Sequence, residues 1–197
     1  MPRRRRSFKR PLGDRRYRKM FVIAVEGVKT EPQYFALLNS LQAVIHVTCL
    51  KDKYNSAPPQ VLKRMTKYLR KQNLRDSDEA WLVVDKDNWT EPQLQELHQW
   101  SQEADNYGFA LSNPNFEYWL LLHFEDGTGI SNAHDCSSRL RNYLPDYDKG
   151  ISARRISKAM IEQATSRAAD RDNPPCEDWP QHTGTTVYRL VQNIFKL

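Results

Sequence analysis

The stretch Phe21-Val22-Ile23-Ala24-Val25-Glu26-Gly27 joins five consecutive apolar residues to a carboxylate and a glycine. A short, wholly apolar run is typical of a strand that is buried on both faces of a parallel sheet. Such a sheet presents its functional groups at the carboxyl ends of its strands. We therefore expect Glu26 at such an end, with Gly27 letting the backbone turn sharply behind it.

Strands and helices alternate after this stretch. Apolar and β-branched runs predict strands near 19–25, 44–50, 79–84 and 107–111. Amphipathic spacing predicts helices that end near residues 41, 72 and 105, and a buried helix after Asn115. The tetrads Thr30-Glu31-Pro32-Gln33 and Thr90-Glu91-Pro92-Gln93 are identical, and each has the composition of a helix-starting capping box. Strand–helix alternation of this kind indicates a parallel sheet.

From about Gly127 the pattern contains helices only, expected near 134–144, 153–170 and 185–195. The predicted fold class is α/β, a mostly parallel four-stranded sheet flanked by helices, with a C-terminal helical appendage. The expected organisation is a basic arm at 1–19, an α/β domain at 20–126 and the appendage at 127–197.

Charge is concentrated at the N-terminus. Residues 1–19 hold ten Lys and Arg and one Asp, a net of +9, and since the whole chain carries +6 the remainder carries −3. Basic arms of this kind usually contact nucleic acid phosphates, although a solvated tail remains the alternative. The candidate nucleic-acid contacts are the arm residues Arg3, Arg4, Arg5, Arg6, Lys9, Arg10, Arg15 and Arg16, together with Lys149.

Several classes of protein are not supported by the composition. No apolar run approaches the roughly 20 residues that a membrane span requires, so no membrane association is expected. The three cysteines are widely separated and odd in number, which indicates a reducing cytoplasm and no zinc site. The sequence Gly27-Val28-Lys29-Thr30 lacks the order of a phosphate-binding P-loop, so nucleotide binding there is rejected, while Lys29 remains a candidate phosphate contact.

Acidic residues follow three of the predicted strands. Asp85 and Asp87 flank Lys86 at one strand end, and in an extended segment residues two apart point the same way. Glu26 and Glu117 follow two other strands. Loop capping would explain one such pair, but four grouped acids repel one another unless a cation or a basic partner lies between them. We therefore predict a Mg²⁺ or Mn²⁺ site, since these ions prefer carboxylate oxygens.

Two further features have simpler interpretations. The helix near 58–72 has a basic outer face, formed by Lys63, Arg64, Lys67, Arg70 and Lys71, and a solvated helix surface is the preferred explanation. His123 lies in an apolar helical run and is interpreted as a buried core histidine in preference to a catalytic residue.

The motifs Glu26-Gly27, Val84-Asp85-Lys86-Asp87 and Ser112-Asn113-Pro114, with Phe116-Glu117 and the run 119–124, resemble those of the RloB-like family. The resemblance extends to Tyr147-Asp148-Lys149 and Thr185-Thr186-Val187. This family is in turn similar to Toprim domains, in which a glutamate after the first strand and a DxD after the third hold magnesium during phosphodiester chemistry. The resemblance assigns those roles to Glu26, Asp85 and Asp87, and Glu117 and Glu31 match additional acids of the nuclease branch.

The resemblance implies a divalent-metal-dependent nuclease, with Lys29, Lys86 and Lys149 near the scissile phosphate. It implies an effector of bacterial antiphage defence controlled by an ATPase partner, acting on RNA, with transfer RNA preferred as target over DNA. The chain is too short for the strand-passage domains of a topoisomerase and lacks the zinc module of a primase. The alternative is a non-catalytic module that binds nucleic acid or an ATPase. Homo-oligomerisation is left open.

Overall fold

The computed structural model describes residues 19–42, 45–50, 58–86, 89–145, 147 and 155–196. Its elements in chain order are β1 (Lys19–Val25), α1 (Thr30–Leu41), β2 (Ile45–Leu50), α2 (Pro58–Leu69), β3 (Glu79–Asp85), α3 (Glu91–Ser101), β4 (Tyr107–Asn113), α4 (Phe116–Leu121), α5 (Ala133–Tyr143), α6 (Lys158–Arg171), β5 (Gly184–Thr185) and α7 (Val187–Phe195). No helix within the described ranges combines the length and apolar character needed to cross a membrane.

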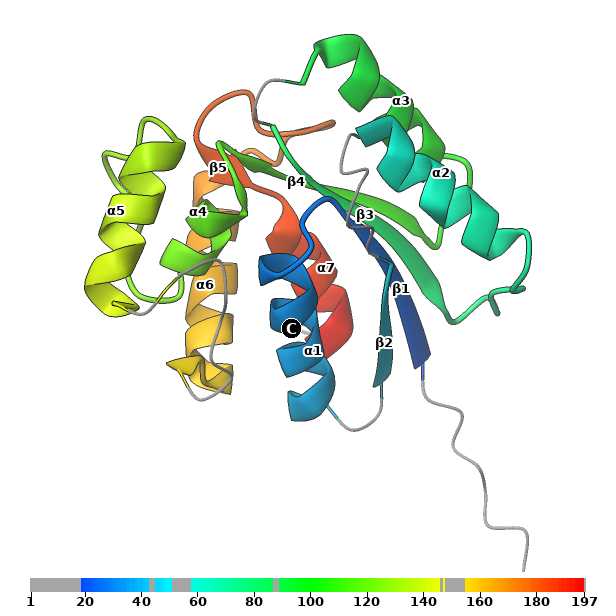
Figure 1. Cartoon of the computed structure of the whole chain (residues 1–197), viewed down its shortest axis with the longest axis horizontal. Coiled ribbons are helices and arrows are strands. Elements are labelled where there is room, and N and C mark those ends of the chain that lie inside the picture. Colours follow the sequence, from blue (N-terminus) through cyan, green and yellow to red (C-terminus); the bar gives the residue numbers. More distant parts are fainter. Residues whose placement is uncertain are drawn as a thin grey trace, which may run out of the picture.

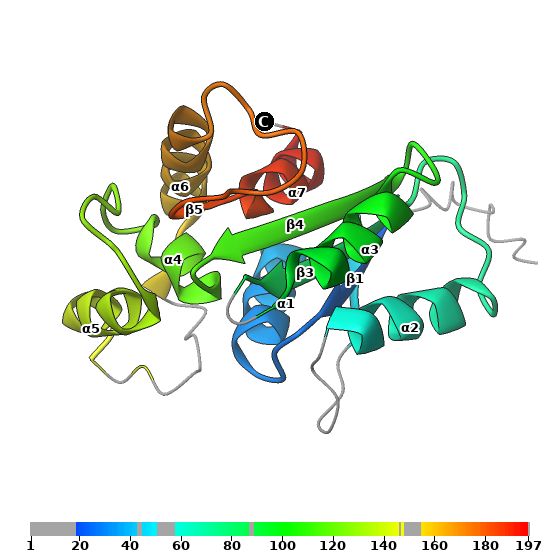
Figure 2. The same cartoon turned by 90° about the horizontal axis from the view of Figure 1, so that it is seen from above.

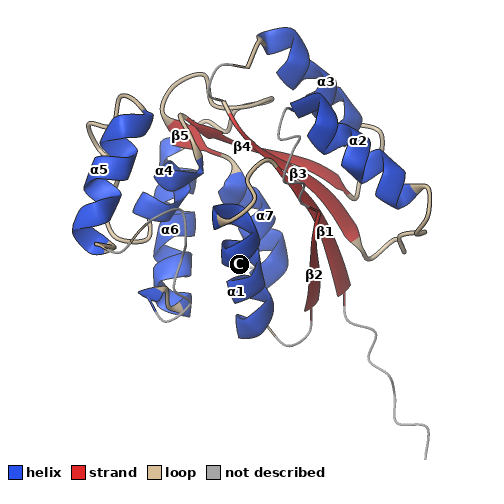
Figure 3. Ribbon diagram, in the orientation of Figure 1, coloured by secondary structure: helices blue, strands red, loops and turns tan. Residues whose placement is uncertain are grey.

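One sheet organises the molecule, with the strand order β2-β1-β3-β4-β5 (Figures 1 and 3). β1 pairs in parallel with β2 and β3, and β3 pairs in parallel with β4. Among the strands of the described residues, only β5 runs antiparallel to its neighbour, β4. The α/β class, the mostly parallel sheet and the four predicted strands are therefore confirmed, and β5 is a fifth strand that the sequence did not predict.

Helices cover both faces of the sheet, which explains why β1 is apolar throughout. Phe21, Ile23 and Val25 face a core shared with α1, α4, α5, α6 and α7. Val22 and Ala24 face a second core shared with α2 and α3. Figure 2 shows α2 and α3 on one side of the sheet and α6 and α7 on the other. All five of these β1 side chains are fully buried, so the alternation expected of a half-exposed strand is absent.

The C-terminal third does not consist of helices only, which corrects the sequence prediction. Gly184 and Thr185 form β5 against Asn113 and Ser112 of β4. The hydroxyls of Ser112 and Thr185 are 2.8 Å apart in a buried hydrogen bond. Apolar residues of α5, α6 and α7 belong to the same core cluster as β1 and α1. The proposed boundary near residue 127 remains a prediction about domain organisation.

The two identical tetrads start their helices differently. In α3 the backbone N–H of Thr90 donates to Oε1 of Gln93 at 3.0 Å, as a capping box requires. In α1 the residue at the N-cap position is Lys29, and no side chain caps the helix there. The hydroxyl of Thr30 instead lies 3.3 Å from the hydroxyl of Tyr147. The expected capping role of Thr30 is therefore wrong, because its hydroxyl is hydrogen-bonded to Tyr147, a residue distant in the sequence.

Candidate active site at the carboxyl edge of the sheet

The register of the parallel strands brings their acidic ends together. Val25 of β1 is paired with Val83 of β3, and Asp85 at the end of β3 is paired with Ser112 of β4. The backbone N–H of Glu26 extends the first pairing by donating to the carbonyl of Val83 at 3.2 Å. Glu26 and Asp85 therefore lie at neighbouring positions on one edge of the sheet, as the sequence predicted.

The carboxylate of Glu26 is oriented toward the end of β3 by two donors. The backbone N–H of Asp85 donates to its Oε2 at 3.2 Å, and the indole N–H of Trp89 donates to its Oε1 at 3.3 Å. Hydrogen bonds from N–H groups stabilise an ionised carboxylate. The structure thus positions a negative charge directly beside the backbone of Asp85.

A second carboxylate, Glu31, approaches the same turn from the first turn of α1. Its Oε1 accepts a hydrogen bond from the backbone N–H of Gly27 at 2.8 Å. Glu31 is buried, with 5% of its surface exposed. A Cβ atom at Gly27 would lie 2.1 Å from Oε2 of Glu31. The backbone φ angle of Gly27 is not in the positive range. Gly27 is therefore needed for the close approach of Glu31, and the sharp turn expected from the sequence is not the reason.

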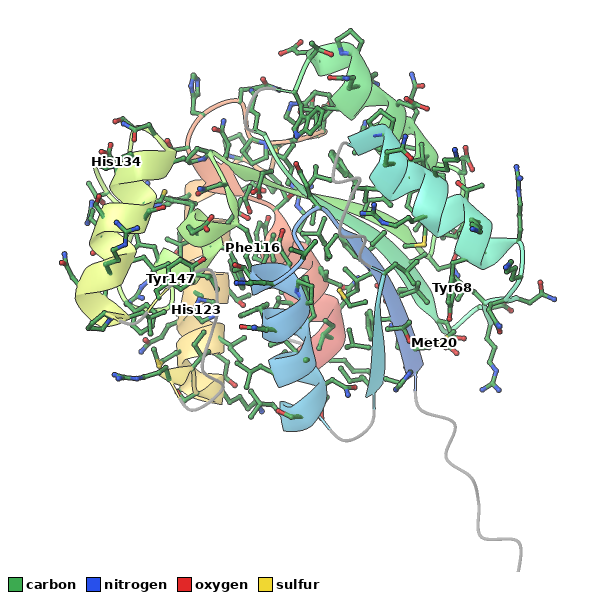
Figure 4. All side chains as sticks on the ribbon, in the orientation of Figure 1. Met20, Tyr68, Phe116, His123, His134 and Tyr147 are labelled. Atoms are coloured by element: carbon green, nitrogen blue, oxygen red, sulfur yellow. The ribbon has the colours of Figure 1, made fainter. Side chains whose placement is uncertain are left out.

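The third carboxylate, Glu117, is in the first turn of α4 and is almost fully buried. The hydroxyl of Tyr147 donates to its Oε1 at 2.9 Å and also contacts Thr30 of α1. Tyr147 is labelled in Figure 4. Burial raises the pKa of Tyr147, and the negative charges of Glu117 and Glu31 raise it further. Tyr147 is therefore a protonated donor that links α1 to α4.

The buried thiol of Cys136 is influenced by the charges of acids that follow two different strands. The pKa of Cys136 on α5 is raised to about 12, first by burial and then by the negative charges of Glu117, Asp135 and Asp85. Glu117 and Asp85 both act on this one sulfur, while Glu117 and Glu31 both act on Tyr147. The shared site predicted for the carboxylates after β1, β3 and β4 remains a prediction, because hydrogen bonds place Glu26 at the backbone of Asp85 and Glu117 at Tyr147, but among the described residues no three acids form one group.

Comparison with known protein families decides the relationship of this chain. The model of the family described as RloB-like protein matches residues 21–194, which is most of the sequence. The chain belongs to the RloB-like family.

The RloB-like match includes Glu26, Glu31, Asp85, Glu117 and Tyr147, so the whole acidic edge lies within the family region. The whole basic arm, residues 1–19, precedes it. Neither the curated proteins nor the solved structures contain a match to this chain. The family assignment is thus confirmed, and the relation to Toprim domains remains a prediction.

Several predicted site residues fall outside the described part of the RloB-like chain, namely Asp87, Lys149 and all the candidate contacts of the arm. Two other predicted basic residues are described. Lys29 is exposed and follows the turn that holds Glu26. Lys86 directly follows Asp85, and its Nζ donates to Oε1 of Gln181 at 3.3 Å. Both cations therefore lie on loops at the acidic edge.

The described residues at this edge provide some of the ligands that a divalent cation requires, but not a complete set. Within the described ranges, no three His, Cys, Asp or Glu side chains form a group that could hold a metal ion. The carboxylate of Glu26 lies at the backbone N–H of Asp85, so two acids stand at neighbouring strand ends, and carboxylate oxygens are the donors that Mg²⁺ and Mn²⁺ prefer. These two residues fit as a partial ligand set, to which the sequence adds Asp87 as the predicted third member.

His123 is a structural residue, in agreement with the interpretation of the sequence. It is 1% exposed, and its Nδ1 lies 3.0 Å from the carbonyl of Trp119, so Nδ1 carries the proton. Its Nε2 then accepts from the hydroxyl of Tyr34, at 3.2 Å. Burial lowers the pKa of His123 to about 4, which keeps the imidazole neutral at pH 7.

Two residues of the site were not identified as such from the sequence. Tyr147 was noted only within a family motif, although its hydroxyl holds Glu117. Trp89, whose indole N–H donates to Glu26, lies two residues after the Asp-Lys-Asp motif. An aromatic residue with a hydrogen-bond donor so close to an acidic motif is the sequence signal that could have identified it as part of the site.

Proposed function

We propose that this RloB-like protein is a divalent-metal-dependent nuclease of the Toprim type that cleaves phosphodiester bonds in nucleic acid. The observation that carries the proposal is the position of Glu26 and Asp85 at neighbouring strand ends on the carboxyl edge of the sheet, where the Glu26 carboxylate accepts from the backbone N–H of Asp85. This edge is the usual location of function in a parallel sheet.

In this proposal, Glu26, Asp85 and Asp87 hold Mg²⁺ or Mn²⁺, with Glu117 as an additional acid. A bound ion of this kind lowers the pKa of the attacking water and neutralises charge on the leaving oxygen. The protein fixes the geometry, because Glu26 is oriented by the donors of Asp85 and Trp89.

Basic residues at the edge complement the acids. Lys29 and Lys86 follow the two strand ends and are proposed, with Lys149, to offset charge on the scissile phosphate. The arginines and lysines of the arm are proposed to bind the backbone of the same substrate, since phosphate contacts require no sequence recognition.

The biological role proposed here follows from the resemblance of the motifs. It is that of an antiphage effector in the bacterial cytoplasm, paired with an ATPase and acting on RNA, with transfer RNA as the preferred target. Sequencing of the cut ends after incubation with total RNA or plasmid DNA distinguishes the RNA from the DNA substrate.

The central test replaces the paired acids without changing their size. Glu26→Gln and Asp85→Asn remove the proposed ligand charges, and Glu162→Gln on the exposed surface of α6 is the matched control. Purified proteins are incubated with RNA and with plasmid in Mg²⁺, in Mn²⁺ and in EDTA. Cleavage by both site variants is expected to fall about 100-fold or more, while the control cleaves normally and all three keep their circular dichroism spectra.

Full cleavage by both site variants would refute the nuclease assignment. The alternative, a non-catalytic binding module, predicts that the acid variants retain cellular function while replacement of Arg3, Arg4, Arg5 and Arg6 by glutamine abolishes it. The two hypotheses therefore give opposite results with the same set of proteins.

A further inference from the structure

The surface of α2 and the turn after it carries positive charge only. Residues 58–71 contain the three lysines Lys63, Lys67 and Lys71 together with Arg64 and Arg70, and no acidic residue. The three lysines are exposed; Lys63 and Lys67 lie one turn apart on α2, about 6 Å from each other, and Lys71 follows in the turn after the helix. We call them the basic row.

The basic row is not neutralised by the protein. Among the described residues, Lys63, Lys67 and Lys71 form neither an ion pair nor a side-chain hydrogen bond, and the ion pairs found there involve Lys19, Arg139, Lys158 and Arg189. Three adjacent charges that form no ion pair repel one another. A ligand of opposite charge would relieve this repulsion.

The surface beside the basic row is hollowed on both sides. A hollow of about 370 Å³ lies between the end of β2 and α2, where Lys67 and Lys71 line it with Arg64. A hollow of about 570 Å³ lies on the other side, where all three lysines line it with one acid, Glu96. The row is therefore a ridge between two depressions, a shape that an extended chain can follow.

The basic row is connected to the acidic edge through Arg64. This side chain comes from the same helix, and its Nη2 donates to the carbonyl of Val25 at 2.6 Å. Val25 directly precedes Glu26. A chain lying along the row would thus be led toward the strand ends that carry Glu26 and Asp85.

We propose that the basic row binds the sugar-phosphate backbone of the nucleic acid strand and directs that strand to the acidic edge. The separation of the lysines is of the order of that between neighbouring phosphates in a strand, so each ammonium group contacts one phosphate. The solvated surface preferred from sequence alone does not account for the hollows or for the link through Arg64. The identity of the strand as substrate rests on the proposed nuclease function.

The test measures binding in the absence of cleavage. Full-length protein is titrated in EDTA with fluorescein-labelled 20-nucleotide RNA and DNA of the same sequence, at several salt concentrations. One variant carries Lys63→Gln, Lys67→Gln and Lys71→Gln. The control variant carries Arg141→Gln, Lys158→Gln and Lys196→Gln, three exposed cations of other elements. Both lose the same charge, and both are checked for folding by circular dichroism.

Loss of three phosphate contacts is expected to reduce the slope of log K against log salt by about 2, which corresponds to an affinity loss on the order of 100-fold at 0.1 M salt. The control is expected to keep the slope of the unmodified protein. Should the triple variant fail to fold, Lys67→Gln alone is expected to reduce the slope by about 0.7.

An unchanged slope in the basic-row variant overturns the proposal and favours an acidic protein as occupant of this surface. Equal losses in the basic-row and control variants also overturn it, since they indicate an effect of net charge alone. Neither result affects the nuclease assignment, which fails only if Glu26→Gln and Asp85→Asn cleave normally. The two proposals can therefore fail separately.

Discussion

Replacement of Gly27 by alanine tests how the acidic edge is built. In the structure, a Cβ atom at this position would lie 2.1 Å from one carboxylate oxygen of Glu31 and 2.4 Å from the other. No such contact is tolerated, so the carboxylate must leave. Because it is the end of a flexible side chain, its displacement costs little by steric repulsion alone.

The main cost is the lost hydrogen bond. Glu31 accepts from the backbone N–H of Gly27 at 2.8 Å, and a hydrogen bond to a charged group contributes about 1.5–3 kcal/mol to stability. Alanine offsets about 0.4–1 kcal/mol of this by restricting the unfolded chain, since the backbone here does not require positive φ. The expected net loss for Gly27→Ala is therefore about 0.5–2.5 kcal/mol.

A double-mutant cycle isolates this mechanism. Urea denaturation at pH 7 is followed for the unmodified protein, Gly27→Ala, Glu31→Ala and the double variant. In the Glu31→Ala background the same glycine replacement is expected to be neutral or stabilising, which gives a coupling energy of about 1.5–3 kcal/mol. Equal destabilisation by Gly27→Ala in both backgrounds would show that the glycine serves its own backbone conformation and would refute the reasoning.

Two further predictions concern buried hydrogen bonds near the site. Because the folded-state pKa of His123 is about 4 and the unfolded value is about 6.5, the unfolded state takes up a proton first as pH falls, and stability should drop by about 3 kcal/mol between those values. Urea titrations from pH 7 to 4 should show a shallower drop for His123→Gln than for the exposed control His134→Gln, and parallel curves would contradict a buried neutral His123. Tyr147→Phe removes the donor to the buried carboxylate of Glu117 and should cost about 1–3 kcal/mol, whereas Tyr143→Phe, at an exposed hydrogen bond, should cost less. Equal costs for the two tyrosine variants would argue against a buried role for Tyr147.

The parts of the fold that the sequence predicted are those specified by local burial. The wholly apolar run 21–25 identifies a strand covered on both faces, and the same pattern identifies 81–84. The acidic edge followed from these strands, because the ends of parallel strands meet at one edge. The position of Glu26 beside Asp85 was predictable for this reason.

The parts that it did not predict depend on contacts between distant residues. Gly184 and Thr185 form a strand only because β4 offers an edge for pairing, and two residues carry no periodicity. Likewise, the tetrad at 30–33 is identical to that at 90–93, yet only the first meets Tyr147. A local pattern cannot distinguish two copies whose neighbours in space differ.

The place of α7 in the sheet's core determines the order in which this protein can fold during synthesis. Its apolar residues lie against β4 and α6 and belong to the same core cluster as those of β1 and α1, although these segments are far apart in the sequence. Until α7 has been synthesised, the face of the sheet that carries Phe21, Ile23 and Val25 remains partly uncovered. The N-terminal strands and helices therefore cannot complete their folding before the C-terminal helix is present. A nascent chain with an open apolar face is prone to aggregation and is a typical client of chaperones.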